Sequence, residues 1–385
     1  MTFINAKIYT CEGSSIIENG YLTILNEKIT AAGDMADYKN DSNEKTTDLS
    51  GKIIAPGFIE AHCHLGMWED SLGFEGDDGN EDTDPCTPQL RAIDAINAFD
   101  KCFDDARAAG VTTVVTGPGS ANPIGGQLAA LKNIRGSIDN MILKAPLAIK
   151  TALGENPKTN YHIKNQSPVT RMATAAIIRE QLFITKRYNE NILKSRQSIG
   201  TDKPEFCIKS EAVIPVLNKE IPIHTHAHRA DDILTAVRIA KEFDIGLVIV
   251  HGTDATAVAD VLRENSIPVL CGPALCDRSK PEMKNLSFKT PGELLKKGIK
   301  TAIVTDHPVT PIQYLPLCAA LAVKDGMDYT EALNAITIYP AQICGLGDRI
   351  GSIKAGKDAD FIILSGEPLD VFSQIEAVYI NGNKL

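Results

Sequence analysis

The sequence has few of the features that mark membrane, secreted or nucleic-acid-binding proteins. No apolar run in its 385 residues approaches the ~18 that a membrane-spanning helix needs. The opening stretch MTFINAKIYTCEGSS has no basic segment followed by an apolar one, so we expect no secretory signal. Asp and Glu outnumber Lys and Arg by 49 to 39, which gives a net charge of −10 without any basic run. A nucleic-acid or membrane partner is therefore not expected.

The cysteines also argue against an oxidising compartment. The chain has nine of them, an odd number, and no C-x-x-C pair occurs. With 43% hydrophobic residues, a chain of this length can build a core without disulfides. We therefore expect reduced thiols, a cytoplasmic location and a small-molecule substrate. Assembly into a homo-oligomer is left open.

The order of apolar and helical stretches predicts an α/β barrel. From about residue 90 onward, helical stretches alternate with short apolar runs such as VTTVVT and IGLVIVHG. Counting the run at Phe58, we predict eight strands, near residues 58, 111, 145, 205, 221, 246, 267 and 300. Eight such repeats predict a (β/α)8 TIM barrel over residues 56–345. Residues 1–55 and 346–385 hold short strands and turns, so we expect both ends to form one composite β-sandwich domain.

Histidines gather where these strands end. In IHTHAHRADD, His224, His226 and His228 alternate, so an extended backbone points all three to one face. Neighbouring side chains on that face lie roughly 7 Å apart, too far for all three to reach one ion through bonds of about 2.0–2.1 Å. The first, sixth and eighth predicted strands end on His62, His64, His251 and Asp306. Because barrel enzymes carry reactive groups at the carboxyl ends of strands, we predict a metal site there.

Two motifs near the ends of the barrel region carry a resemblance to a known family. PGFIEAHCHLG resembles the P-G-x-I-D-x-H-x-H opening of the amidohydrolase superfamily of metal-dependent hydrolases, and GSIKAGKDADFIIL resembles its closing G-x-x-x-x-G-x-x-A-D motif. The branch it most resembles contains imidazolonepropionase and related amidohydrolases, including Xaa-Pro dipeptidases. The resemblance implies a barrel with a β-sandwich built from both chain ends. It also implies one or two divalent metal ions, with zinc expected.

The resemblance assigns roles to the strand-end residues. His62 and His64 match the histidine pair that holds the more buried metal, and His251 matches the strand-six histidine. Asp306 matches the strand-eight aspartate, which contacts metal and takes a proton from the attacking water, so Asp306 and His251 are the expected catalytic residues. On strand five the family pattern selects His226 as the ligand. His224 would then pack inside the barrel and His228 would reach its mouth.

The predicted fourth strand bears on the number of metal ions. In EFCIKSEA, Lys209 and Glu211 share a face if the segment is extended. In two-metal members of the superfamily, a carbamylated strand-four lysine bridges the ions, and Lys209 would occupy that place. Glu211 could bridge instead, or Lys209 and Glu211 could form an ordinary ion pair beside a single metal.

The residue three positions after His226 bears on the reaction. Deaminases and imidazolonepropionases of this superfamily typically carry a glutamate there, whereas this chain has Arg229. A guanidinium at the mouth suits a substrate carboxylate, and a salt bridge to Asp231 or Asp232 is the structural alternative. We therefore favour hydrolysis of an amide or cyclic amide in a small carboxylate-bearing substrate, such as a dipeptide or an N-acyl amino acid. Imidazolonepropionase or ring-deaminase activity and a non-catalytic metal-binding barrel remain the alternatives.

Further substrate contacts are expected from loops at the barrel mouth. GPGSANPIGGQ could offer backbone N–H groups to a substrate, or could be a tight connection that needs its glycines. The acidic stretch FEGDDGNEDTDP is either a solvated loop or part of the binding region for a zwitterion. The candidate contacts are His228, Arg229, Asn122, Gln127 and Arg278.

Overall fold

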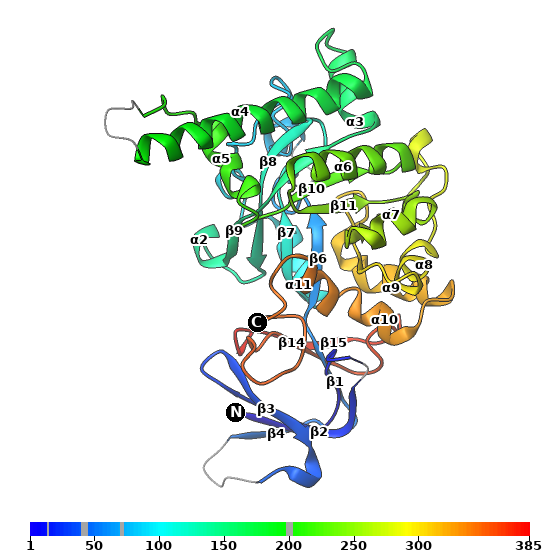
Figure 1. Cartoon of the computed structure of the whole chain (residues 1–385). Coiled ribbons are helices and arrows are strands. Elements are labelled where there is room, and N and C mark those ends of the chain that lie inside the picture. The colour runs from blue at the N-terminus through cyan, green and yellow to red at the C-terminus, as the bar shows by residue number, and fades with distance from the viewer. Residues whose placement is uncertain (14, 40–44, 70–72, 198–202) are drawn as a thin grey trace.

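The structure, a computed structural model, describes residues 1–13, 15–39, 45–69, 73–197 and 203–385. Its strands form two sheets of eight strands each. One sheet makes up the barrel, and the other lies at one end of it and contains both chain termini (Figure 1). The predicted fold class, a barrel with a second sheet built from both ends, is confirmed.

The strands of the barrel sheet follow one another in chain order. They are β6 (Phe58–Cys63), β7 (Val111–Thr116), β8 (Ile124–Lys132), β9 (Ile142–Ala152), β10 (Ile223–Ala227), β11 (Leu247–His251), β12 (Val269–Cys271) and β13 (Thr301–Ile303). Strands such as LVIVH are buried along their whole length. Burial on both sides is typical of a sheet covered by helices, and explains why these strands are continuous apolar runs.

Two details of the predicted barrel are wrong. Among the described residues near position 205 no strand forms, because residues 203–207 are irregular and Ile208–Leu217 is helix α5. Phe206 and Ile208 of this segment are 71% and 58% exposed, unlike the side chains of a buried strand. The fourth strand is instead β9, because β8 was missed and pairs antiparallel with both β7 and β9. Its sequence IGGQLAALK is rich in glycine and alanine, which are poor strand formers.

Helices cover the outside of the barrel sheet (Figure 1). They are α1 (Lys101–Ala108), α2 (Ile138–Met141), α3 (Glu155–His162), α4 (Arg171–Gln197), α5 (Ile208–Leu217), α6 (Ala230–Phe243), α7 (Ala259–Glu264), α8 (Thr290–Lys296), α9 (Leu315–Lys324), α10 (Tyr329–Asn334) and α11 (Ile338–Ile343). None of those in the described ranges has the combined length and apolar character that crossing a bilayer would require. All nine cysteines are free thiols.

A buried carboxylate connects the two ends of the barrel sheet. Glu60 on β6 accepts hydrogen bonds from the His62 backbone N–H at 3.0 Å and from the Thr305 backbone N–H at 2.8 Å. The Thr305 hydroxyl also donates to it, at 2.6 Å. The His64 N–H donates to the His307 carbonyl at 2.9 Å, which makes a second link between the same segments. Glu60 therefore fixes the segment after β13 against the end of β6.

The second sheet joins the two ends of the chain. Its strands are β1 (Thr2–Tyr9), β2 (Ile16–Leu25), β3 (Lys28–Asp34), β4 (Thr46–Asp48), β5 (Ile53–Pro56), β14 (Phe361–Leu364), β15 (Ile375–Ile380) and β16 (Asn383–Lys384). C-terminal β14 pairs with N-terminal β5, so both ends share one sheet, as predicted. The domain limits at residues 55 and 346 stay a prediction.

The closing sequence motif holds this sheet to the barrel. Asp358 and Asp360 of GKDADF lie beside the buried Lys132 at the end of β8. The Lys132 Nζ lies 2.8 Å from an Asp358 oxygen, donates to Asp360, and donates to Asn381 at 2.9 Å. The motif therefore has a structural role, which is to neutralise a lysine at the junction.

Candidate active site

The carboxyl ends of the barrel strands bring together the predicted histidines and aspartate. His62 lies on β6, and His64 follows the last residue of that strand. His226 lies on β10, and His228 follows the last residue of that strand. β11 ends on His251, and Asp306 follows β13 by three residues. All but the half-buried Asp306 are buried. The parallel strands therefore place distant parts of the sequence at one end of the barrel.

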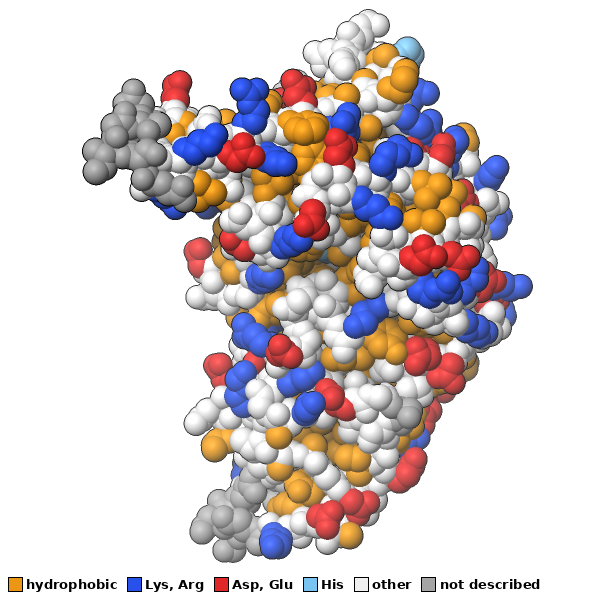
Figure 2. Space-filling model, in the orientation of Figure 1, with side chains coloured by type: hydrophobic (Ala, Val, Ile, Leu, Met, Phe, Trp, Pro, Cys, Tyr) orange, Lys and Arg blue, Asp and Glu red, His pale blue; other side chains and the backbone are white. Residues whose placement is uncertain are grey.

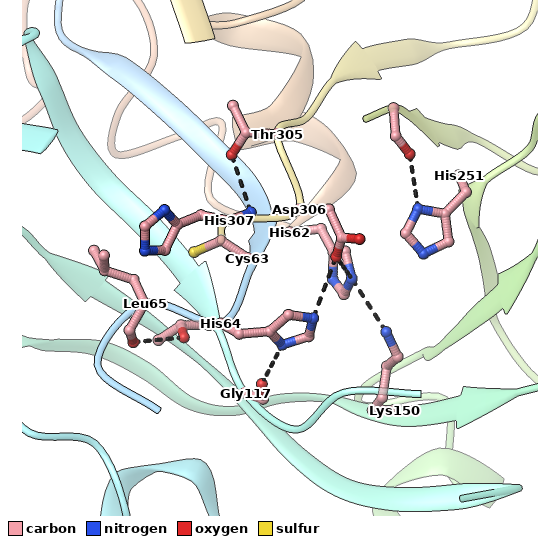
Figure 3. A network of polar contacts seen from close by, with 12 residues as sticks. His62, Cys63, His64, Leu65, Gly117, Lys150, His251, Thr305, Asp306 and His307 are labelled. Carbon is pink, nitrogen blue, oxygen red and sulfur yellow. Dashed lines mark hydrogen bonds and ion pairs between the residues drawn. The ribbon is translucent and has the colours of Figure 1, made fainter. Parts of the chain in front are cut away.

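The first group of ligand atoms comes from His62, His251 and Asp306, and His64 lies beside it (Figure 3). The Asp306 Oδ1 lies 3.3 Å from His62 Nε2 and 3.2 Å from His64 Nε2. The His64 Nδ1 is 2.7 Å from the Gly117 carbonyl, which can only accept, so Nδ1 carries the proton. The Nε2 of His64 faces a carboxylate oxygen. This contact needs either a proton or a metal ion between the two atoms, so the donor set fits a divalent metal.

The second group consists of His226, His228 and His251. Their ring nitrogens lie within 4.8 Å of one another, as do the ligand atoms of His62, His251 and Asp306. His251 belongs to both groups, and its Nδ1 donates to the Gly272 carbonyl at 2.7 Å, which leaves Nε2 free to bind. Neither ring nitrogen of buried His226 has a hydrogen-bond partner within the described residues. These two groups support one or two metal ions.

The backbone is unusual at two of these residues. His251 and Asp306 have φ angles of 75° and 54°, in the left-handed region that costs an ordinary residue of order 1–3 kcal/mol. Each stands where the chain leaves the end of its strand. Such strain persists when the surrounding structure imposes it, and it is concentrated at functional sites.

Burial opposes protonation of three of these imidazoles, those of His62, His226 and His251. It lowers the pKa of His62 to about 3, assisted by the nearby Lys150 ammonium. Burial also holds the pKa values of His226 and His251 well below the ordinary range. Although burial opposes ionisation of Asp306, the neighbouring His251, His62 and His64 hold its pKa well below the usual value. Neutral imidazoles beside a carboxylate are the forms that bind divalent metals.

The lysine of this site is Lys150. It lies on β9, is fully buried, and its Nζ is 3.1 Å from His62 Nε2. Burial lowers its pKa to about 8. The sequence signal for it is a lysine within the mostly apolar run APLAIKTA. Lys150 pairs in register with His224 on β10, which lies inside the barrel and outside both ligand groups of the described residues.

The structure places Lys209 and Glu211 away from the histidines. Both belong to α5, so the predicted strand that brought them to the barrel interior is wrong. The Lys209 Nζ forms an ion pair with Asp84 at 2.7 Å, and Glu211 accepts a hydrogen bond from the Tyr188 hydroxyl at 2.6 Å. A bridging role for either residue is not supported by this arrangement.

A cavity of about 830 Å³ opens above the two groups and is lined by His64, His226, His228 and Asp306. Of the predicted substrate contacts, only His228 lines this cavity. The His228 Nδ1 lies 2.7 Å from the Thr253 hydroxyl. Exposed Arg229 pairs with Asp231 at 2.8 Å, the structural alternative considered above. Asn122 and Gln127 donate to backbone carbonyls of Glu81 and Pro88, and Arg278 donates to that of Leu286. The GPGSANP loop does border the cavity, through Gly119, Ser120 and Ala121.

Two further charged residues near the cavity come from the segment after β12. Lys280 lines the cavity, and its Nζ donates to Asn156 Oδ1 at 2.6 Å. Buried Glu282 places Oε1 3.7 Å from His226 Nε2, and its Oε2 accepts from the Glu155 N–H. Neither residue belongs to a motif, so only the fold reveals them.

An aromatic side chain forms another wall of the cavity. Trp68 lies edge-on to the ring of His64, with ring centroids 4.6 Å apart. The acidic stretch that follows Trp68 is held to the body of the barrel, because Asp82 pairs with Lys164 and Asp84 with Lys209. Residues 70–72, which lie between Trp68 and this stretch, are outside the described residues.

Known proteins resemble the chain over nearly its whole length. A crystal structure of an amidohydrolase from Thermotoga maritima MSB8 superposes with a TM-score of 0.96 at 42% identity, covering 100% of this chain and 99% of that one. Imidazolonepropionase from Erwinia tasmaniensis is 23% identical, over 94% of this chain and 90% of that protein. Amidohydrolase tasK from Hapsidospora irregularis is 28% identical over 96% of this chain, which spans only 39% of the length of tasK.

The sequence profile of the amidohydrolase family matches residues 53–385. The match contains both sequence motifs, every barrel strand and all the residues of the two ligand groups. The chain therefore belongs to the amidohydrolase family.

Proposed function

We propose that this protein is a metal-dependent hydrolase that cleaves the amide C–N bond of a small, carboxylate-bearing substrate such as a dipeptide or an N-acyl amino acid. The observation that carries the proposal is the pair of ligand groups, His62–His251–Asp306 and His226–His228–His251, three of whose residues (His226, His228 and Asp306) line a cavity. We include a cytoplasmic location and zinc in this proposal.

The ligands proposed for the metal are His62, His64, His226, His251 and Asp306. A divalent ion held there would act as a Lewis acid on the scissile carbonyl and would make water a strong nucleophile near neutral pH. His228 joins the second group or, since it lines the cavity and contacts Thr253, contacts the substrate. His224 is not a proposed ligand, because its place is deeper in the barrel.

Lys150 takes the bridging place that the resemblance had suggested for Lys209. Its pKa of about 8 leaves a sizeable neutral fraction near neutral pH. A neutral amine can add to carbon dioxide, which forms an N–C bond and releases one proton. The product, a carbamate, would supply negative charge beside His62, where the imidazoles supply none. This step supports two ions, whereas unmodified Lys150 would favour one.

Asp306 is the residue suited to move the proton. Its lowered pKa keeps it ionised, so it can accept a proton from the attacking water and give it to the departing nitrogen. Glu60 acts through position, since it holds the backbone of Thr305 directly before Asp306. His62 is held by the same carboxylate, through its backbone N–H.

The lining of the cavity supports a zwitterionic substrate. Lys280 is the lysine that lines the cavity. Its Nζ donates a hydrogen bond to the neutral Asn156 side chain, and within the described residues it has no ion-pair partner. Remaining N–H donors of that ammonium can bind a substrate carboxylate. Glu155 and Asp277 also line the cavity and can bind a substrate amine. Lys280 therefore replaces Arg229 and Arg278 as the proposed carboxylate contact.

A second candidate is hydrolysis of a ring C–N bond, as in imidazolonepropionase. The observation in its favour is Glu282, whose Oε1 is 3.7 Å from His226 Nε2 and lacks a hydrogen bond within the described residues. Glu282 comes from the segment after β12. The glutamate that imidazolonepropionases typically carry lies three positions after the histidine that corresponds to His226, where this chain has Arg229. Glu282 could contact a ring nitrogen of the substrate.

The decisive experiment combines metal analysis with a substrate panel. Purified protein is expected to contain one or two equivalents of metal and to hydrolyse dipeptides or N-acyl amino acids more readily than hydantoins, lactams, imidazolones or aminopurines. K280M should raise KM for carboxylate substrates roughly 10-fold or more, since a charge-assisted hydrogen bond contributes about 1.5–3 kcal/mol, and should not affect their amidated analogues. K284M, a loss of an exposed lysine four residues away, is the matched control. A metal-free protein without hydrolytic activity would contradict the proposal.

A further inference from the structure

The longest helix of the structure has one covered and one uncovered face. α4 has 27 residues, lies outside the barrel and forms part of the connection from β9 to β10 (Figure 1). Its inner face carries buried side chains spaced three and four residues apart, at Thr174, Ile178, Gln181, Thr185, Tyr188 and Ile192. This spacing places them on one stripe, which packs against the protein body.

The opposite face of α4 carries apolar side chains at its middle. A shallow hollow of about 580 Å³ is lined by residues of α4 itself, among them Ala176, Glu180, Phe183, Ile184, Arg187 and Asn191. Phe183 and Ile184 are 44% and 47% exposed, although one edge of Phe183 packs on Phe243. Figure 2 shows apolar side chains exposed among charged ones over this helix. Nothing in the described part of the chain covers this face.

The order of charges along this face is complementary to itself. Glu180 lies three residues before Phe183, and Arg187 lies three residues after Ile184. Two copies of α4 that cross antiparallel about a two-fold axis would place Glu180 of each copy opposite Arg187 of the other. Phe183 of each copy would meet Ile184 of the other. Among the ion pairs of the described residues, neighbouring Arg179 is paired with Glu242, whereas none includes Glu180 or Arg187.

We propose that α4 is the interface of a homodimer, in which two copies of the helix pack antiparallel about the Phe183–Ile184 step. The ends of the helix match as well, because Met172, 80% exposed, falls on the same flank as Leu193 of the second copy, 48% exposed in the single chain. Stable interfaces bury about 1,200–2,000 Å² in total, and one helix pair supplies the lower part of that range. We therefore expect a dissociation constant of micromolar order.

The experiment is a charge swap read by sedimentation equilibrium between about 1 and 100 µM protein. Wild type should shift from the mass of one chain to that of two as concentration rises. E180R and R187E should each weaken the dimer roughly 10-fold or more, because each places like charges opposite each other twice. The double variant E180R/R187E restores opposite charges and should recover most of the affinity.

K186E is the matched control, since it makes nearly the same charge change on the flank of the same helix and should leave the dimer intact. Circular dichroism checks that every variant keeps its helix content. A wild-type chain that stays monomeric up to 100 µM would overturn the proposal. So would a dimer that both single variants leave unchanged, or one that the double variant fails to restore.

Discussion

Two buried lysines on neighbouring strands have opposite surroundings. Lys132 at the end of β8 contacts the carboxylates of Asp358 and Asp360 and the side chain of Asn381. Lys150 on β9 contacts the imidazole of His62, and burial lowers its pKa to about 8. Lys132 is therefore a neutralised cation at the junction of the two sheets, whereas Lys150 is a buried amine without a carboxylate bonded to it.

The difference separates stability from function. A buried ion pair whose partners are all present fixes the arrangement of the elements that carry it, here β8 and the C-terminal motif. A buried polar group without such partners is expensive unless a ligand or a chemical modification completes it. The barrel mouth collects several such groups, including His62, His226 and Glu282. Buried polar atoms without hydrogen-bond partners thus mark the site more clearly than charged residues alone.

The largest effect is expected on the functional side of this comparison, from Asp306→Asn. The substitution removes the proton acceptor, so kcat/KM should fall about 10²–10⁴-fold. The variant should keep its fold, because asparagine tolerates the left-handed backbone, and circular dichroism checks this. Asp244→Asn is a matched control, since Asp244 has the same φ of 54° but lies on the surface. Equal activity losses in both variants would refute the role of Asp306.

The structural side is tested by Lys132→Met. Removing one partner of a buried ion pair typically costs 3–5 kcal/mol, so the free energy of unfolding at pH 7 should fall by about that amount. The metal bound per folded molecule should not change. Lys28→Met removes a half-exposed lysine from the same Asp358 and should cost about 0–1 kcal/mol. Urea unfolding of both variants measures the difference.

The same variant has an expected pH dependence. Lys132 helps to hold the pKa of Asp358 below its usual value, while burial raises that of Asp360. Without Lys132 both folded-state pKa values rise, so near and above the unfolded value of about 3.9 the folded variant binds more protons than the folded wild type. The stability lost through the substitution therefore grows as pH rises through that window. Unfolding curves at pH 4 and pH 7 should show the smaller penalty at pH 4.

Lys150→Met should not lower the free energy of unfolding, in contrast to Lys132→Met. Replacing a buried amine with an apolar side chain of similar length should leave the metal-free protein equally stable or stabilise it by about 1–2 kcal/mol. Its metal content should fall by one equivalent if Lys150 is a bridging group. A loss of stability as large as that of Lys132→Met would show that Lys150, like Lys132, stabilises the fold, and would contradict the distinction between the two lysines.

The smallest effect is expected from Lys209→Ala. The ion pair of Lys209 with Asp84 is partly exposed, and such pairs contribute about 0–1 kcal/mol. Metal content and kcat/KM should stay within about 3-fold of wild type. A variant that loses a metal ion would return the bridging role to Lys209.

Local patterns predicted what is local. The pair His62 and His64, the alternation around His226 and the motif ending at Asp360 each lie within a dozen residues, so sequence alone located them. Lys209 was misplaced because EFCIKSEA was predicted to be extended, whereas its apolar Phe206 and Ile208 are exposed and the segment enters α5. Missing β8 then shifted the count, and Lys150 on the true fourth strand was overlooked.

Contacts between distant segments could not be predicted in the same way. Lys280 lines the cavity and Glu282 lies beside His226 because the segment after β12 packs there, and no periodicity of the sequence encodes that path. For Arg229 the sequence left a substrate carboxylate and a salt bridge to Asp231 or Asp232 as alternatives, and the structure pairs it with Asp231. The strained backbone of His251 and Asp306 is likewise a result of the closed barrel.

Trp68 gives the cavity an optical signal of its own. It is the only tryptophan in the chain, and its indole stands edge-on to His64 at the cavity wall. Emission excited near 295 nm therefore originates at one place, beside a proposed ligand, rather than as an average over the molecule. A paramagnetic ion entering the His62–Asp306 group would quench this emission, and a substrate that excludes water would shift it toward the blue. The chain thus carries a built-in fluorophore for following the occupancy of its active site in real time.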